Sequence, residues 1–379
     1  MPTVLDPFLS LLQQGLSFQK EGQLKAAEEM YRQVVQQAPR HAMAWHLLGT
    51  VAGQQGRKWD AVSHLQQSLQ LYPGDPTAWK NLASAFQDIG EYAHARSAAE
   101  RALALRPDYH GARLVWATSS TALGMHSEAM TAFRLMSQSQ FEADAVWPDF
   151  WRTAIALCDW SSAREAAQKV RHFLESGQMG MLSFDCLAFA DDPALHQRSA
   201  RATALKLRER HLGMAPLNPG YIAPVVAPGS ERIRVAYLSA DLHDHATAYL
   251  MAELFELHDR QLFEIIAVSF GPDSDSPMRH RLRNAFDQFW EVRACSDEEI
   301  VKRMIEAGVD IAVDLKGYTR DSRPSLFHHR PAPVIVSYLG YPGTMGTDLY
   351  DYVIGDTVVT PQEKTAYYDE QVVQMPWCY

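Results

Sequence analysis

The small and apolar residues in the first part of the chain recur every 34 positions. The recurring residues are Gly22, Gly56, Gly90 and Gly124, Ala27, Ala61, Ala95 and Ala129, and Pro39, Pro73 and Pro107. Glycine permits a tight turn, alanine lets two helices approach closely, and proline ends a helix. The period predicts an α-solenoid over residues 8–143, with about four stacked helix pairs at 8–41, 42–75, 76–109 and 110–143.

Tryptophan recurs at the same interval. Trp45 and Trp79 lie 34 residues apart, and Leu11 and Arg113 occupy the equivalent outer positions. This combination of period, tryptophan, small residues and closing proline resembles the tetratricopeptide repeat. The concave face of such a solenoid can hold an extended chain, so the resemblance implies a docking surface for a protein or peptide. A rigid spacer is the alternative.

The regular step is lost after Phe141. Aromatic residues between 147 and 160 predict at least one more helix pair, and residues 192–211 predict a long helix. We interpret residues 144–215 as atypical helices that cap the solenoid and link it to the C-terminal part of the chain. The prolines and glycines of residues 213–229 predict a loop at the domain boundary.

From Arg232 onward, short apolar runs rich in β-branched and aromatic residues alternate with helix-like segments. The predicted strands are 233–238, 263–268, 289–292, 310–315 and 334–338. Such alternation is typical of α/β folds whose strands are joined by right-handed crossovers. It predicts a parallel, Rossmann-like lobe over residues 230–379.

The turn after the first predicted strand carries an acid and two imidazoles, which are His243, Asp244 and His245. We expect Thr247 to be the N-cap of a helix over residues 248–254. Ligands of open α/β sheets bind at the carboxyl ends of strands, so the turn is a candidate site.

Two further loops, 316–323 and 339–346, should converge on the same rim of the sheet. Their glycines let backbone amides approach an anionic or sugar ligand, or merely permit tight turns. Neither a GxGxxG fingerprint nor a P-loop is present to decide between these two interpretations.

Composition narrows the function classes. The net charge is −10 and no Lys/Arg cluster stands out, which argues against a nucleic-acid partner. The four cysteines have no CxxC spacing, so we expect a reduced, cytoplasmic setting without a disulfide framework or a zinc site. No secretory signal is recognisable, and no apolar stretch reaches the roughly 18 residues that span a bilayer, so we expect no membrane association.

The combination of motifs is that of a known family. A tetratricopeptide solenoid followed by SADLHDHATAYLM, DLKGYTRDSR, RPAPVIVSYLGYPGTMG and YDYVIGD resembles the O-GlcNAc transferase family, including its bacterial and SPINDLY-like members. The resemblance implies the first half of a GT-B glycosyltransferase. Such enzymes move N-acetylglucosamine from the donor UDP-GlcNAc to Ser or Thr hydroxyls of proteins, with inversion, no cofactor and no required metal.

The resemblance also implies site residues. The family's active-site histidine falls on His245, and the acid proposed as a proton acceptor falls on Asp241. Which of the two takes the proton stays open, and His245 could instead make a polar ligand contact. The substrate-binding and donor-binding positions fall on Thr247, Gly317, Tyr318, Arg323, Leu339, Gly340, Tyr341, Pro342 and Gly343.

Two departures from the family matter. Asp244 and Ala246 flank the histidine where the family often has Asn and Pro. The sequence also stops near the end of the family's first lobe, so the resemblance implies that the C-terminal nucleotide-sugar lobe is supplied by a second chain or a cleaved remainder. Loss of that lobe would remove the stabilisation of the leaving group. The alternatives are SPINDLY-like transfer of fucose from GDP-fucose and a non-catalytic adaptor that binds peptides.

Overall fold

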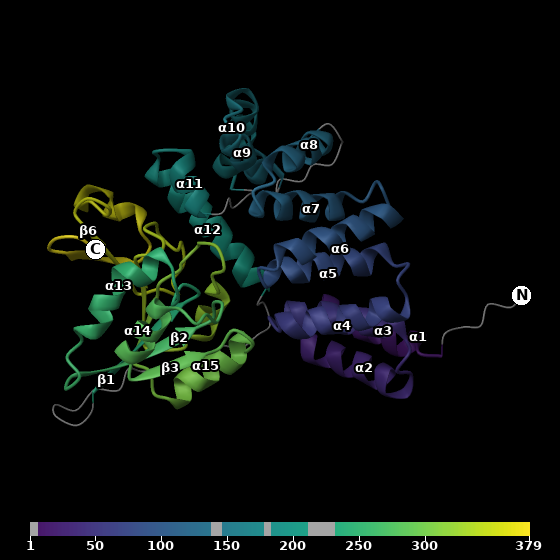
Figure 1. Ribbon diagram of the computed structural model, residues 1–379, viewed down its shortest axis with the longest axis horizontal. Coiled ribbons are helices and arrows are strands. Elements are labelled where there is room, and N and C mark those ends of the chain that lie inside the picture. Colours follow the sequence, from purple (N-terminus) through teal and green to yellow (C-terminus); the bar gives the residue numbers. More distant parts are fainter. Residues whose placement is uncertain (1–6, 138–145, 178–182, 211–231) are drawn as a thin grey trace, which may run out of the picture. The chain divides into compact units, whose positions relative to one another are not determined.

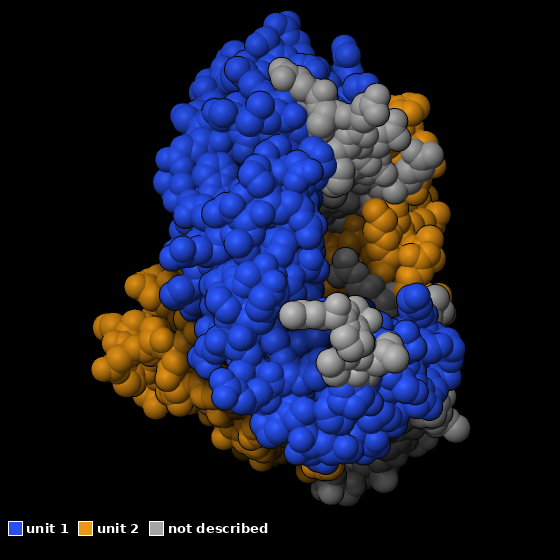
Figure 2. Space-filling model, turned by 90° about the vertical axis from the view of Figure 1, so that its right-hand side faces the viewer, with its two compact units in different colours: residues 1–170 blue, residues 171–379 orange. Residues whose placement is uncertain are grey.

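The computed structural model describes residues 7–137, 146–177, 183–210 and 232–379 (Figure 1). The chain divides into two compact units, Met1–Val170 and Arg171–Tyr379, which Figure 2 shows in different colours. The loop predicted at residues 213–229 lies outside the described residues. Across the described ranges, no helix combines the length and apolarity needed to cross a membrane.

The first unit repeats a helix pair at the predicted interval. The recurring glycines follow the first helix of each pair with φ between 76° and 78°, a conformation that favours glycine. The recurring alanines are 0–2% exposed, so the close helix approach is also confirmed. The helices are α1 Leu9–Lys20, α2 Leu24–Gln37, α3 Ala42–Gln54, α4 Lys58–Leu71, α5 Pro76–Asp88, α6 Tyr92–Leu105, α7 His110–Ala122, α8 His126–Ser137, α9 Val146–Ala156 and α10 Trp160–Glu175.

The outer residues of the second, third and fourth pairs each bind the backbone at the end of the preceding pair. The Trp45 indole N–H donates to the Pro39 carbonyl at 2.9 Å, and Trp79 repeats this contact with Pro73 at 2.8 Å. Arg113 occupies the same position, and its guanidinium donates to the Pro107 carbonyl at 2.5 Å. The interval therefore specifies a hydrogen bond that either tryptophan or arginine can make.

Two helices that precede the sheet in sequence belong to the second unit. They are α11 Ser183–Phe189 and α12 Pro193–Arg210. Ala200 of α12 lies in the core of the sheet, and Arg201 pairs with Asp369 through contacts of 2.9 and 2.6 Å. The segment 144–215 that we interpreted as one linker is thus divided between the two units, because α12 docks through contacts with residues far away in sequence.

The second unit contains one parallel sheet with the strand order β3-β2-β1-β4-β5-β6-β7. The first five strands lie within one or two residues of their predicted positions. The last two were not predicted, and β7 carries mostly exposed side chains rather than an apolar run. The strands are β1 Ile233–Ser239, β2 Phe263–Ser269, β3 Gln288–Glu291, β4 Ile311–Asp314, β5 Val334–Tyr338, β6 Tyr352–Asp356 and β7 Gln371–Met375.

Helices cover both faces of the sheet, as the alternation of strand residues requires. Ala236 and Leu238 of β1 face the core that contains α15 and η1, whereas Val235 and Tyr237 face the core that contains α13 and α14. The helices between strands are α13 Ala246–Glu256, α14 Pro277–Ala285 and α15 Asp297–Glu306, and the short 3₁₀ helices are η1 Pro324–His329 and η2 Gln362–Tyr367.

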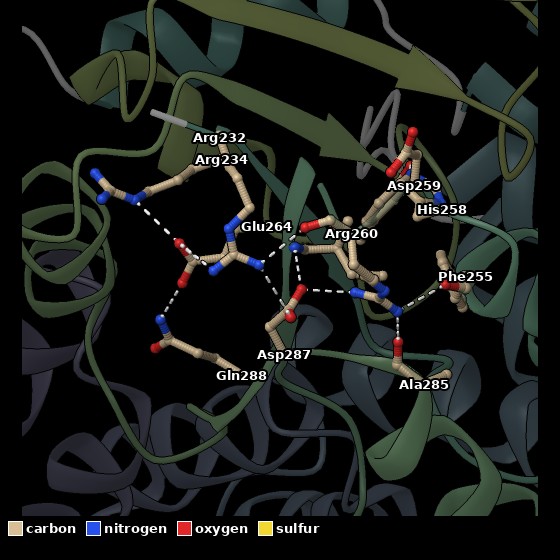
Figure 3. A network of polar contacts seen from close by, with 12 residues as sticks. Arg232, Arg234, Phe255, His258, Asp259, Arg260, Glu264, Ala285, Asp287 and Gln288 are labelled. Atoms are coloured by element: carbon tan, nitrogen blue, oxygen red, sulfur yellow. Dashed lines mark hydrogen bonds and ion pairs between the residues drawn. The ribbon is translucent and has the colours of Figure 1, made fainter. Parts of the chain in front are cut away.

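The amino ends of the central strands carry a network of ion pairs (Figure 3). Arg232 lies 3.6 Å from Glu264 and 3.5 Å from Asp287. Asp287 also pairs with Arg260 at 2.6 Å and accepts the Ile265 backbone N–H at 2.8 Å. We call this group the amino-edge network; it closes the edge of the sheet opposite to the candidate site.

Candidate functional site

The strand order reverses between β1 and β4, and the predicted turn lies at that switch point. These strands are in register from Val235 opposite Ile311 to Leu238 opposite Asp314. The residues that follow them are therefore brought side by side at the carboxyl edge of the sheet. Open α/β sheets bind ligands at this kind of position.

A buried ion pair joins the two strands there. The Lys316 ammonium donates to Asp241 Oδ2 at 2.6 Å, and the two residues are 5% and 8% exposed. Asp241 was expected at the site, whereas Lys316 was assigned no role. The available signal was a lysine two residues after the apolar strand β4.

His245 lies beside this pair as the N-cap of α13. Its Nδ1 atom accepts the Thr247 backbone N–H at 3.2 Å and lies 3.7 Å from Asp241 Oδ2, while 43% of its side chain is exposed. The prediction that Thr247 caps the helix was wrong. The imidazole satisfies the Thr247 amide, so the helix begins two residues earlier and Thr247 lies buried in its first turn.

A buried arginine holds the turn that carries these groups. Arg279 of α14 is 1% exposed, donates to the Leu242 carbonyl and the Ser269 hydroxyl, and pairs with Glu291 at 2.6 Å. Its carbonyl contact fixes the backbone between Asp241 and His243. Partial burial, opposed by the charge of Asp241, lowers the pKa of His243 below its usual value.

Asp314, the last residue of β4, shapes the backbone beneath Lys316. Its carboxylate accepts the Lys316 backbone N–H at 2.9 Å and the Tyr350 hydroxyl at 2.7 Å. Burial raises the pKa of Asp314, because the charged form loses its hydration.

The loop after β4 packs against the loop after β5. Gly317 has φ of 51°, and a Cβ atom there would lie 2.6 Å from the Tyr341 Cβ. The Tyr318 hydroxyl donates to the Met345 carbonyl at 2.8 Å, and its ring meets the Tyr341 ring edge-on at 5.7 Å. Gly317, Tyr318 and Tyr341 are therefore brought together as predicted, with both aromatic rings buried.

The conformation of the loop after β5 is fixed by its backbone dihedral angles and by close backbone contacts. Leu339 has φ of 64°, and Gly340 packs so closely on the Leu315 carbonyl that a Cβ atom would overlap it. The Pro342 carbonyl accepts the Tyr368 hydroxyl at 2.8 Å, and a Cβ atom at Gly343 would meet the Tyr341 ring.

Glu370 anchors the far end of this loop and was not predicted. Its carboxylate accepts the Thr344 hydroxyl at 2.8 Å and the Met345 N–H at 2.6 Å. Burial raises the pKa of Glu370. Like Arg279, Glu370 is remote in sequence from the group it holds, and no local pattern links the two.

Arg323, predicted to lie near the acceptor, points into the structure. Its guanidinium donates to Asp297 Oδ1 at 2.7 Å and to the Cys295 carbonyl at 2.9 Å, and the residue is 8% exposed. It ties the loop after β4 to the start of α15, so its contribution to the site is indirect.

The cluster at the rim brings together a carboxylate and an imidazole from the turn after β1 and an ammonium from the loop after β4. Such a set can take up a proton, donate hydrogen bonds and stabilise negative charge. Within the described parts of the chain, no three His, Cys, Asp or Glu side chains are grouped as ligands of a metal ion.

Comparisons with known proteins support the resemblance seen in the motifs. Residues 213–379 match the model of glycosyl transferase family 41, and residues 12–76 and 78–110 match tetratricopeptide repeat models. All the site residues named above lie in the glycosyltransferase segment. The predicted fold, a tetratricopeptide solenoid followed by a parallel α/β lobe, is thereby confirmed.

Curated relatives carry matching descriptions. The probable UDP-N-acetylglucosamine--peptide N-acetylglucosaminyltransferase SEC of Arabidopsis thaliana is 31% identical over 199 residues, which are 52% of this chain and 20% of the relative. The UDP-N-acetylglucosamine--peptide N-acetylglucosaminyltransferase of Caenorhabditis elegans is 26% identical over 230 residues, 58% of this chain and 20% of the relative. The chain thus spans about a fifth of the length of these relatives.

A solved structure is similar over most of the chain. A mutant O-GlcNAc transferase from Thermobaculum terrenum is 25% identical, and the match covers 98% of this chain and 58% of that one with a TM-score of 0.44.

Proposed function

We propose that this chain, with a glycosyl transferase family 41 segment behind tetratricopeptide repeats, transfers N-acetylglucosamine from UDP-GlcNAc to Ser or Thr hydroxyls of proteins. The observation that carries the proposal is the convergence of Asp241, His245 and Lys316 at the switch point of the sheet. The relatives named above support this donor and this class of acceptor. Because the chain spans about a fifth of their length, we propose transfer for an assembly that includes a second, nucleotide-sugar lobe, on this polypeptide or on another.

The proposed reaction needs two electrostatic tasks. The acceptor oxygen bonds to the anomeric carbon while the bond from that carbon to the diphosphate oxygen breaks, so the hydroxyl proton must leave and negative charge develops on the diphosphate. Asp241 and His245 are the groups at the rim that could take the proton. We also propose that His245, half exposed at the start of α13, contacts the donor.

The glycine-containing loops would shape the sugar pocket. Gly340 and Gly343 lie where a side chain would collide with the loop after β4 or with Tyr341, so the backbone is the surface that they present. Backbone amides at such positions suit hydroxyl and phosphate oxygens. No metal or cofactor is part of the proposal.

The solenoid would hold acceptor proteins by the backbone of an extended segment. The four cysteines, none of which forms a disulfide, suit the reduced cytoplasmic setting that we propose for this activity.

Calorimetric titration with UDP, UDP-GlcNAc and GDP-fucose, with the polypeptide content checked by mass spectrometry, tests the proposal. We expect saturable binding of UDP and UDP-GlcNAc when the second lobe is present. In that assembly His245→Ala should lower turnover by roughly 100-fold, whether the ring accepts a proton or donates a hydrogen bond.

His258→Ala is the matched control, because His258 binds the Tyr237 hydroxyl near the amino edge of the sheet, away from the rim. It should leave turnover within about twofold of the wild type, since the ring makes no contact at the rim. Tight binding of GDP-fucose in place of UDP-GlcNAc would support the alternative function, transfer of fucose. If an assembly with both lobes binds neither nucleotide sugar, the result would support the other alternative, a non-catalytic adaptor that binds peptides.

A further inference from the structure

We propose that Lys316 is a positioning residue that keeps the proton of the neutral His245 ring on Nε2, by holding Asp241 in a buried ion pair. The placement of the proton follows from the geometry of the chain alone. Its consequence for catalysis rests on the proposed function.

The first observation is the helix cap. A ring nitrogen that accepts an N–H hydrogen bond must present a lone pair. His245 Nδ1 accepts the Thr247 N–H at 3.2 Å, so in this arrangement Nδ1 carries no proton. The neutral ring must then carry its proton on Nε2.

The second observation is that the competing contact is not made. In a ring oriented by a carboxylate, Nδ1–H would donate to Asp241 and leave Nε2 free to act as a base. The distance from Nδ1 to Asp241 Oδ2 is 3.7 Å, too long for a hydrogen bond. The same Oδ2 atom accepts from the Lys316 ammonium at 2.6 Å.

The charges around the His245 ring explain why its proton is on Nε2 and not on Nδ1. Lys316 from the loop after β4 compensates Asp241 at contact distance, and the two side chains are 7% and 11% exposed, so solvent screens the pair weakly. His243 and Asp244 lie in the same turn, and Arg279 of α14 lies beneath it. Without the ammonium, the nearest charge to Nδ1 would be an uncompensated carboxylate, which attracts a proton to that nitrogen.

The consequence concerns the role of the ring. With the proton on Nε2, His245 presents a hydrogen-bond donor at the half-exposed rim rather than a base. Such a donor fits an oxygen of the sugar nucleotide that gains negative charge during transfer. The question left open between His245 and Asp241 is thereby narrowed: the ring assists as a donor and does not take the acceptor's proton.

Nuclear magnetic resonance of protein labelled with ¹⁵N-histidine reads the tautomer directly. The His245 ring is assigned by the loss of its signals in His245→Gln. We expect the neutral wild-type ring to carry its proton on Nε2. A proton on Nδ1 would overturn the proposal without any further variant. No substrate is needed, so this result and the test of the proposed function can fail independently.

Lys316→Met tests the part played by the lysine. We expect the ring proton to move toward Nδ1, where it can donate to the carboxylate of Asp241. If Lys316→Met does not fold, Lys316→Gln replaces it, because glutamine keeps an N–H donor without the charge. We expect Lys316→Gln to move the ring proton in the same direction, with a smaller effect. The double variant Asp241→Asn with Lys316→Met should return the proton to Nε2, because the carboxylate that attracts it is gone.

The matched control is Lys302→Met, which removes a lysine from an exposed pair with Glu298 on α15. It should leave the His245 signals unchanged. A folded Lys316 variant with the wild-type tautomer would overturn the role of Lys316. In an active assembly we also expect Lys316→Met to lower kcat roughly 10-fold at neutral pH with little change in the acceptor KM.

Discussion

The two edges of the sheet use charge in different ways. In the amino-edge network the side chains of Arg232, Arg260 and Asp287 are 40%, 35% and 25% exposed, and each acid serves several partners (Figure 3). At the carboxyl edge, Lys316 and Asp241 are buried and form one short contact. An exposed ion pair loses little hydration on folding and contributes little to stability. A buried pair carries a desolvation penalty that the attraction between its charges only partly offsets. A pair kept under that penalty beside His245 is better explained by function than by stability.

Removing one cation from each edge should give the largest difference between the two edges. Lys316→Met should lower the free energy of unfolding of the α/β unit by about 3–5 kcal/mol, because it removes the ammonium that compensates the buried carboxylate of Asp241. Arg232→Met should cost only about 0–1 kcal/mol, since its partners keep other cations and water. Hydrogen exchange of the β1 amides, residues 233–239, measures the difference where both cations are close to the strand.

The double variant Asp241→Asn with Lys316→Met serves as the control for this pair. Because it removes both charges, it should recover most of the lost protection. If Arg232→Met proved as costly as Lys316→Met, the distinction between the two edges would be wrong.

The two edges also differ in how much space surrounds their glycines. Gly340→Ala drives a Cβ atom into the Leu315 carbonyl, a backbone group that cannot turn aside, and should cost about 3 kcal/mol. Gly308→Ala, at the end of α15, meets only the flexible end of Arg234 at 2.8 Å and has φ of 64°, so about 1 kcal/mol is expected.

Denaturant unfolding measures both costs, and calorimetry with UDP separates their functional effects. In the two-lobed assembly, Gly340→Ala should also weaken UDP binding because the loop after β5 must shift. Gly308→Ala should leave binding unchanged. Equal binding by the two variants would argue against a role for that loop in the pocket.

Local pattern was sufficient for those parts of the fold in which each element carries its own signal. The 34-residue interval specified the helix pairs, and strands such as 233–238 and 334–338 have apolar runs that fix their positions. Strand β7 lacks such a run because its side chains face solvent, and α12 joins the sheet through Ala200 and the pair between Arg201 and Asp369. Neither the strand β7 nor the docking of α12 can be predicted from the local sequence.

The candidate site divides in the same way. His245 and Asp241 stand out because polar residues follow an apolar strand, and the family resemblance adds the loops after β4 and β5. Lys316 and Arg279 could not be assigned from sequence, since their roles depend on contacts across 75 and 37 positions. Thr247 was misjudged as the cap because a threonine is a more common N-cap than a histidine.

A third comparison uses two aspartates with the same ordinary pKa of 3.8, one at each edge. Burial raises the pKa of Asp314. At Asp287 burial acts in the same direction, but the Ile265 N–H and Arg260 outweigh it and lower the pKa. The stability that Asp314 contributes is therefore fully present below pH 3.8, and it is lost as the pH rises through the raised pKa of this residue. The stability that Asp287 contributes is present above pH 3.8, and it is lost as the pH falls through the lowered pKa of this residue. Relative to Asp314→Asn, the wild type should lose stability as the pH rises from 4, and relative to Asp287→Asn it should lose stability as the pH falls below 4, each by at most about 1.4 kcal/mol per pH unit. Urea unfolding of the wild type and both variants from pH 3 to pH 7 measures these slopes, and slopes of the same sign would show that the two edges hold their carboxylates alike.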